Sequence, residues 1–191
     1  MGKLYIAYGS NLNMRQMYGR CPGAKFLGTG VIENYALQFK GSPHGAHATI
    51  APQEGASVPV AIWRIQKWDE KSLDLYEGYH EKGYCYYDKE QIPVKFENGM
   101  QIKGMLYIMD KTKDFGFPTY DYYQKCLQGY RDCGLDTRVL EKALKESVQM
   151  ARDQTRRAQE AQAQNVQEPN EIQETQERQE PLDQMKFVKE G

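Results

Sequence analysis

Apolar and polar residues alternate along several stretches of the first two-thirds of the chain, which is the spacing of half-buried β-strands. Residues 31–39 are an example, with Tyr35 and Phe39 on the same side. The pattern predicts strands at residues 4–7, 31–39, 47–51, 58–65, 84–96 and 101–109. Pro52 should end the third of these strands, and Asn98-Gly99 should form the tight turn of a hairpin between the last two.

Elsewhere, apolar residues recur every three to four positions behind a residue that can cap a helix. These signals predict helices at residues 14–18, 70–77, 120–130 and 139–148, capped in turn by Asn13, Asp69, Thr119 and Asp136. Gly78 should end the second helix, because glycine readily takes the left-handed conformation that closes a helix. Together the elements predict an α+β fold, with a barrel or strongly curled sheet flanked by helices.

The composition changes beyond Met150. Residues 151–191 are rich in Gln, Glu, Ala and Arg, with almost nothing apolar until Met185, Phe187 and Val188. Such a segment buries too little apolar surface to offset the entropy lost on ordering. We therefore expect one domain at residues 1–150 and a disordered or partly helical tail at 151–191, with the terminal apolar cluster as an alternative partner-binding element.

Charge and length narrow the class of protein. The 191 residues suffice for one domain with a real core, and the net charge of −1 gives no broad attraction to nucleic acid or to an anionic membrane. The chain enters a strand pattern at once and contains no apolar run that could span a bilayer. We expect a cytoplasmic monomer or homodimer that binds neither nucleic acid nor membrane.

Cysteines and histidines give no metal signature. The four cysteines are widely scattered, without a Cys-x-x-Cys pair, and are expected to be reduced thiols: Cys21, Cys85, Cys126 and Cys133. His44 and His47 flank a glycine in a loop and lack accompanying ligands at metal-binding spacing. We therefore expect no metal and no cofactor.

The segment after the first strand is a candidate binding loop, formed by Tyr8, Gly9, Ser10, Asn11 and Leu12. Glycine permits a tight turn, and Ser and Asn side chains can hydrogen-bond to neighbouring amides. The turn would direct several backbone N–H groups inward. Such a cluster can hold a carboxylate or an oxyanion without a metal or a basic side chain.

Glu77 is a candidate general base. It falls in the last turn of a predicted helix, within a segment that also contains Tyr76, Tyr79, Tyr84, Tyr86 and Tyr87. Burial among aromatic rings would raise the carboxyl pKa from about 4.3 toward neutrality, where a carboxylate accepts protons effectively. A solvated glutamate at a helix end is the alternative interpretation.

The order of these segments resembles the γ-glutamylcyclotransferase family over residues 3–148. The resemblance rests on the run from Tyr5 to Leu12, on Ala48-Thr49-Ile50, on the stretch from Leu73 to Gly78, on Tyr84, and on Pro118-Thr119 followed by Tyr122. The glutathione-degrading branch carries Tyr-Gly-Ser-Leu, and Asn11 departs from it toward the branch that handles other γ-glutamyl compounds. His44-Gly45-Ala46-His47 follows the family's glycine pair only loosely.

The resemblance implies a small mixed β-barrel with flanking helices and conversion of a γ-glutamyl amino acid or amine to 5-oxoproline and the free amine. By position it implies that residues 8–12 form the substrate loop, that Glu77 is the catalytic acid and base, and that Tyr84 and Tyr122 line the site. The substrate carries its own nucleophile, the α-amine, and correct orientation can supply an effective concentration of about 10⁵ M or more.

Two alternatives stay open at this stage. One is a γ-glutamylamine cyclotransferase, including one that acts on γ-glutamyl-ε-lysine, and the other is a non-catalytic small-molecule-binding module on the same fold. Pocket shape would separate the two kinds of enzyme. The presence of Glu77 favours catalysis over binding alone.

Overall fold

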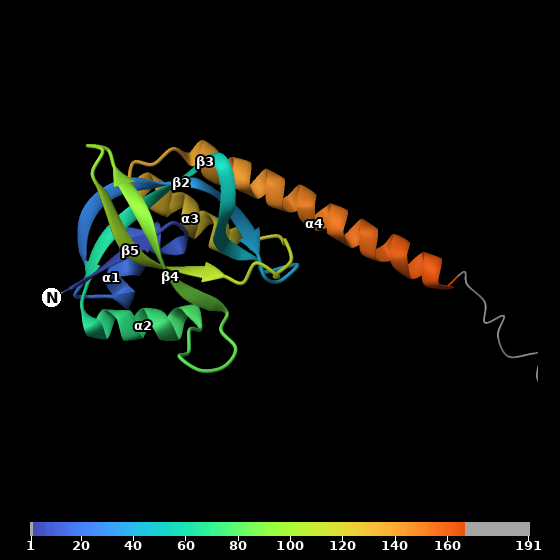
Figure 1. Cartoon of the computed structure of the whole chain (residues 1–191), viewed down its shortest axis with the longest axis horizontal. Coiled ribbons are helices and arrows are strands. Elements are labelled where there is room, and N and C mark those ends of the chain that lie inside the picture. Colours follow the sequence, from blue (N-terminus) through green and yellow to red (C-terminus); the bar gives the residue numbers. More distant parts are fainter. Residues whose placement is uncertain (1, 167–191) are drawn as a thin grey trace, which may run out of the picture. The chain divides into compact units, whose positions relative to one another are not determined.

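Five strands close into a barrel in the structure, a computed structural model that describes residues 2–166 (Figure 1). Their order around the barrel is β1-β3-β2-β4-β5. β1 and β5 are parallel where they meet, and the other neighbouring pairs are antiparallel. The predicted small mixed barrel is therefore confirmed. The strands are β1 (Lys3–Ala7), β2 (Lys25–Lys40), β3 (His47–Ile65), β4 (Tyr87–Phe96) and β5 (Gln101–Met109).

β3 is longer than predicted, because Pro52 does not end it. The strand pairs with β2 along nearly its whole length, but the register shifts: Glu33 pairs with Ser57, while Tyr35 pairs with Pro52. Residues 53–56 therefore form a bulge, and a proline is tolerated where the ladder of hydrogen bonds is already interrupted. The prediction of separate strands at 47–51 and 58–65 is wrong.

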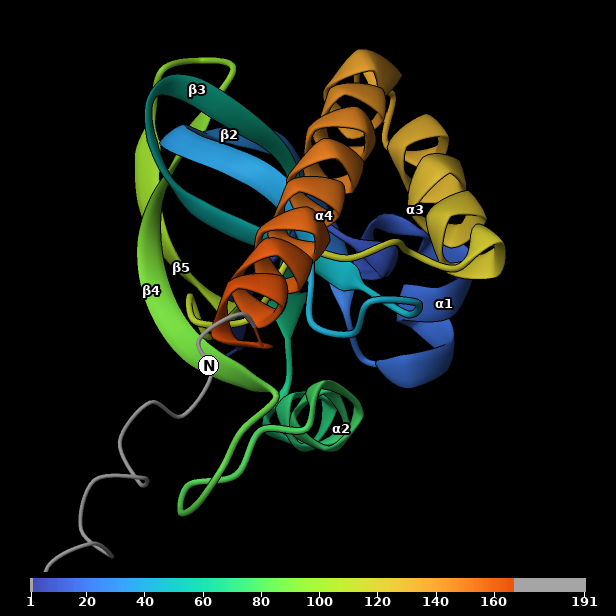
Figure 2. The same ribbon diagram turned by 90° about the vertical axis from the view of Figure 1, so that its right-hand side faces the viewer.

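The helices flank the barrel, and α2 lies at one end of it in both Figure 1 and Figure 2. The predicted caps Asn13 and Thr119 are confirmed, since their side chains accept hydrogen bonds from the first turns that follow. Asp69 lies inside the first turn of α2, where its carboxylate accepts from the backbone N–H of the true cap, Gln66, at 2.9 Å. The helical elements are η1 (Ser10–Leu12, 3₁₀), α1 (Met14–Arg20), α2 (Lys67–Glu77), α3 (Tyr120–Asp132) and α4 (Thr137–Val166).

α4 continues well past residue 148, where the sequence pattern predicts its end. Ala151 is buried, and the Gln154 side chain accepts a hydrogen bond from the backbone N–H of Phe115 at 3.0 Å. The chain divides into two compact units between Thr155 and Arg156. The described part of the second unit is helical, and most of the predicted tail, including the cluster at 185–188, lies outside the described residues.

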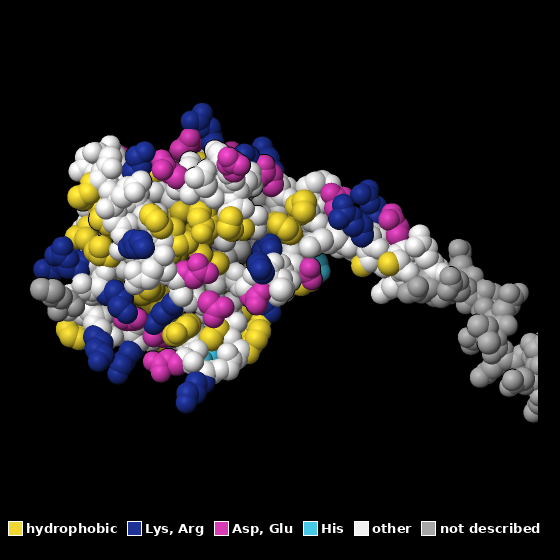
Figure 3. All heavy atoms as spheres, in the orientation of Figure 1, with side chains coloured by type: hydrophobic (Ala, Val, Ile, Leu, Met, Phe, Trp, Pro, Cys, Tyr) yellow, Lys and Arg dark blue, Asp and Glu magenta, His cyan; other side chains and the backbone are white. Residues whose placement is uncertain are grey.

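Large side chains of the barrel strands are fully buried, among them Phe39, Ile62 and Trp63. On the face shown in Figure 3, side chains of both charge signs are interspersed with apolar ones. Within residues 2–166, no helix has the length and apolar character needed to cross a membrane.

Candidate active site

The loop after β1 turns sharply into η1 at Gly9. A Cβ atom on Gly9 would lie 3.1 Å from the Cβ atom of Ala48, so the close approach of the loop to β3 favours a glycine. Within the turn, the N–H of Leu12 donates to the Gly9 carbonyl at 3.0 Å. The N–H groups of Ser10 and Asn11 precede that of Leu12, the first donor of the turn, and so have no partner within it. These two donors are the ones that the turn offers to a ligand.

Glu77 is the last residue of α2, followed by Gly78 in the left-handed conformation. Its Oε1 accepts a hydrogen bond from the Asn11 side-chain amide at 2.9 Å, which connects the helix end to the loop. The same amide nitrogen also donates to the hydroxyl of Tyr5 at 2.7 Å. Burial raises the pKa of Glu77 to about 7, although the Arg20 charge and the Asn11 hydrogen bond both favour the carboxylate.

Two connected cavities meet at Glu77. The inner cavity, of about 30 Å³, is lined by the loop from Tyr8 to Asn11, by Ala48 and Glu77, and by Tyr5, Tyr87, Tyr107 and Tyr122. The outer pocket, of about 450 Å³, shares Ser10, Glu77, Tyr87 and Tyr122 and adds His47, Leu75, Tyr76, Gly78 and Tyr86. Roughly 10–15 Å³ accommodates one water, so the inner cavity suits a group the size of a carboxylate. The outer pocket has room for the rest of a small molecule.

The tyrosines of the inner cavity are held by hydrogen bonds to the backbone. The Tyr87 hydroxyl donates to the Ala48 carbonyl at 2.7 Å, and the Ala48 N–H donates to the Tyr122 hydroxyl at 3.0 Å. Tyr8 donates to the carbonyl of Tyr107. Burial raises the pKa of Tyr8, Tyr87 and Tyr122, so these phenols are neutral at physiological pH. The result is a fixed, uncharged wall around Glu77.

Most of the residues predicted for the site come together here. Tyr8, Gly9, Ser10, Asn11, Glu77 and Tyr122 all line the inner cavity. Leu12 is fully buried in the core, and Tyr84 is 71% exposed, with its ring 4.7 Å from the Lys113 ammonium. Neither side chain lines either cavity. Tyr86 and Tyr87, which follow Tyr84 in the same tyrosine-rich segment, line the pocket instead.

Arg20 is a site residue that the sequence analysis missed. Its guanidinium donates to the Asn11 side-chain oxygen, and its carbon atom lies 3.4 Å from the centroid of the Tyr76 ring. The hydrogen bond fixes the Asn11 amide with its nitrogen toward Glu77. The expectation of a loop without a basic side chain is therefore incomplete. The only sequence signal was the position of Arg20 at the end of the helix that follows the loop.

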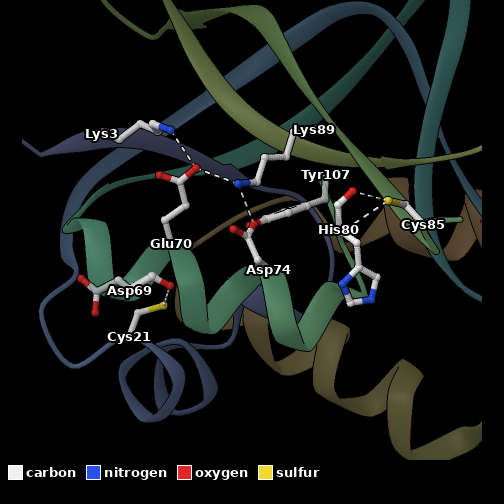
Figure 4. Close-up of polar contacts among 9 residues, drawn as sticks. All are labelled: Lys3, Cys21, Asp69, Glu70, Asp74, His80, Cys85, Lys89 and Tyr107. Atoms are coloured by element: carbon white, nitrogen blue, oxygen red, sulfur yellow. Dashed lines mark hydrogen bonds and ion pairs between the residues drawn. The ribbon is translucent and has the colours of Figure 1, made fainter. Parts of the chain in front are cut away.

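A cluster of charged side chains holds α2 against the barrel. The Lys89 ammonium on β4 lies 2.7 Å from carboxylate oxygens of both Glu70 and Asp74, one turn apart on α2 (Figure 4). The Tyr107 hydroxyl donates to Asp74 at 2.6 Å, while its ring lines the inner cavity. Since Glu77 lies one turn beyond Asp74, these contacts fix the end of the helix that carries it.

No group of three or more His, Cys, Asp or Glu side chains between residues 2 and 166 could hold a metal ion. His47 instead packs in the outer pocket, where its Nδ1 lies 2.9 Å from the Tyr86 hydroxyl. The arrangement at Glu77 can accept and return a proton beside a cluster of hydrogen-bond donors.

The chain is similar to known proteins. Residues 5–125 match the family described as gamma-glutamyl cyclotransferase, AIG2-like. The chain is 30% identical over 147 residues to the gamma-glutamylcyclotransferase of Homo sapiens, covering 73% of this chain and 76% of the human one, and 30% identical over 146 residues to that of Mus musculus, with the same two shares covered.

Solved structures agree with the sequence relatives. A gamma-glutamyl cyclotransferase superposes with a TM-score of 0.67 at 27% identity, covering 75% of this chain and 86% of its own. An uncharacterized protein from Homo sapiens superposes with a TM-score of 0.64 at 27% identity, covering 74% of this chain and 86% of its own. The family match includes the loop, Glu77 and the aromatic wall. The chain therefore belongs to the γ-glutamyl cyclotransferase, AIG2-like family.

Proposed function

We propose that this protein is a γ-glutamyl cyclotransferase, which releases 5-oxoproline and an amino acid or amine from a γ-glutamyl compound. The observation that carries the proposal is Glu77, a carboxyl whose pKa burial raises to about 7, at the junction of two cavities and hydrogen-bonded to the loop after β1. The family and the similar cyclotransferases support the same activity.

The proton transfers follow from the chemistry of the substrate. Its α-amine, with a reference pKa of about 8, is mostly an ammonium at neutral pH and must lose a proton before it attacks. Glu77 takes that proton, the amine nitrogen bonds to the γ-carbonyl carbon, and a tetrahedral intermediate forms. When the bond from this carbon to the leaving nitrogen breaks, protonated Glu77 gives its proton to the departing amine, and the carboxylate then takes the second proton from the ring nitrogen and passes it to the free amine, which leaves as an ammonium.

The loop supplies the complementary charge. The N–H groups of Ser10 and Asn11 are available at the start of η1, where they can hold the substrate carboxylate or the oxyanion of the intermediate. Arg20 adds a positive charge behind Asn11. The inner cavity, of about 30 Å³, has the size of one such oxygen-bearing group, which supports a leaving group on the side of the outer pocket.

The neutral tyrosines keep Glu77 basic. They limit the access of water to its carboxylate, which makes the charged form less stable and raises the affinity for a proton. A base with a pKa near the working pH is the most effective one. Since the nucleophile belongs to the substrate, the reaction needs neither a cofactor nor an enzyme nucleophile.

The two alternatives are a γ-glutamylamine cyclotransferase and a non-catalytic binding module. The comparisons favour neither, since the curated relatives are gamma-glutamylcyclotransferases. A binding module would also have no use for a carboxyl with a pKa near 7 in its pocket. We propose a cytoplasmic enzyme whose partner is the small-molecule substrate.

The test is incubation of the purified protein with a panel of γ-glutamyl amino acids and γ-glutamyl amines, with 5-oxoproline measured by mass spectrometry. The proposal predicts 5-oxoproline and the free amine in equal amounts from at least one compound. Binding of these compounds without any turnover would favour the binding module.

A further inference from the structure

The outer pocket contains an apolar wall that the proton transfers do not use. Leu75 and Tyr76 on α2 form one side, and both are exposed to solvent, at 80% and 48%. Tyr86 and His47 line the same pocket. Side chains of this kind on a helix surface beside a cavity provide contact area for an apolar ligand group.

The part of the pocket lined by His47 and Tyr86 is uncharged. The His47 ring packs edge-on against the Tyr122 ring at 4.6 Å, and its Nδ1 lies 2.9 Å from the Tyr86 hydroxyl. Burial lowers the pKa of His47, so the imidazole is neutral at pH 7. Among the residues that line the pocket, Glu77 is the one with a carboxyl group, and in the proposed reaction this group transfers protons.

A positive charge borders the same pocket. The Arg20 guanidinium lies over the Tyr76 ring, 3.4 Å from its centroid, and Nη1 lies 3.5 Å from the Ser10 hydroxyl oxygen. Tyr76 and Ser10 both line the outer pocket. An ammonium group placed there would be repelled by Arg20, whereas a carboxylate would be attracted.

We propose that the outer pocket is the leaving-group site and that it selects an α-amino acid with an apolar, above all aromatic, side chain over the ε-amine of lysine or another cationic amine. This inference rests on the proposed function. The side chain of the leaving amino acid packs against Leu75, Tyr76 and Tyr86. Its carboxylate lies toward Arg20, while its nitrogen remains beside Glu77.

Four substrates separate the parts of this proposal. Comparing kcat/KM for γ-glutamyl-phenylalanine and γ-glutamyl-glycine measures the contribution of the apolar contact. γ-Glutamyl-phenethylamine differs from the phenylalanine compound only by the absence of the carboxylate. γ-Glutamyl-ε-lysine has no apolar end group and carries an ammonium and a carboxylate at the far end of its leaving group. We expect kcat/KM for phenylalanine to exceed that for glycine by about tenfold or more, since a side chain enters an apolar site. The phenethylamine and ε-lysine compounds should react more slowly than the phenylalanine compound.

The variant Leu75→Ser tests the wall at a position too exposed to disturb folding. It should lower the ratio of kcat/KM between the phenylalanine and glycine compounds. Met100→Ser is the matched control, because Met100 is 52% exposed and does not line this pocket. It should leave the ratio unchanged.

Equal kcat/KM for the phenylalanine and glycine compounds, or a preference for the ε-lysine compound, would overturn the inference. If no compound yields 5-oxoproline, the proposed function fails. Calorimetric measurement of the binding of the same compounds then tests separately whether the outer pocket prefers an apolar group. Tighter binding of the phenylalanine compound than of the glycine compound supports an apolar site. Equal binding refutes it.

Discussion

Replacing Glu77 by glutamine changes activity and stability in opposite directions. The amide has nearly the same shape and can still accept the hydrogen bond that the Asn11 amide now donates at 2.9 Å. It cannot take the proton of the substrate ammonium. We expect kcat to fall by roughly 10²–10⁴, with little change in substrate binding.

The stability effect follows from the raised pKa. Burial moves the pKa of Glu77 from 4.5 to about 7, and at 1.36 kcal/mol per pKa unit this corresponds to a destabilisation of about 3 kcal/mol above pH 7. Between these two values the folded protein binds more protons than the unfolded chain, so stability falls as the pH rises. Glu77→Gln removes this penalty. The variant should therefore be more stable than the wild type at pH 8 by up to about 3 kcal/mol, and the difference should shrink toward pH 4.5.

The assay combines two measurements over the same pH range. Release of 5-oxoproline from pH 5 to 9 should show a wild-type rate that falls below about pH 7, as Glu77 becomes protonated. The variant's residual rate should lack this acid limb. Urea unfolding at pH 8 and pH 5 gives the stability difference. Glu81→Gln is the control, since Glu81 is exposed in the loop after α2. Near-normal turnover in Glu77→Gln, or no gain in stability at pH 8, would refute the reasoning.

Three further predictions concern the surroundings of the site. Lys89→Met leaves Glu70 and Asp74 on α2 without their shared cation; we expect a lower kcat, because the end of α2 that carries Glu77 is held less firmly. Lys3→Met removes only an outer contact to Glu70 and should keep the wild-type kcat. A chain that ends at Thr155 should keep the stability and activity of the full chain. A chain that ends at Met150 lacks the turn of α4 that contains buried Ala151 and should unfold at a lower urea concentration. Equal unfolding midpoints for the two chains would show that this turn does not contribute to stability. Incubation with EDTA should leave 5-oxoproline release unchanged, because the nucleophile belongs to the substrate; activity lost to EDTA and restored by a metal would contradict the mechanism.

Local signals in the sequence determined most of the elements. Asn13 and Thr119 cap helices because a short polar side chain can accept from the first free N–H groups, whatever the rest of the fold. Asn98-Gly99 forms the turn of the β4–β5 hairpin, with Gly99 at a positive φ of 82° that the turn requires. The glycine, serine and asparagine after β1 likewise indicated a tight turn, and this loop lines the inner cavity.

Only the tertiary structure decided which aromatic side chains surround Glu77. The sequence does not distinguish the tyrosines of residues 84–87 from one another. The path of the chain leaves Tyr84 exposed, whereas Tyr87 lines the inner cavity. The length of β3 also depends on its partner strand, because a shift in the register with β2 lets the strand continue past Pro52. Strand pairing between distant segments is not encoded in the spacing of one segment alone.

The chemistry of the site depends on the same long-range contacts. Asn11 and Glu77 are 66 positions apart, and their hydrogen bond exists only because the barrel brings the loop after β1 to the end of α2. Burial by residues from separate strands and helices raises the pKa of Glu77 to about 7. The sequence therefore determined which residue could act as the base, and the packing around it determined its proton affinity, since desolvation depends on neighbours that only the fold assembles.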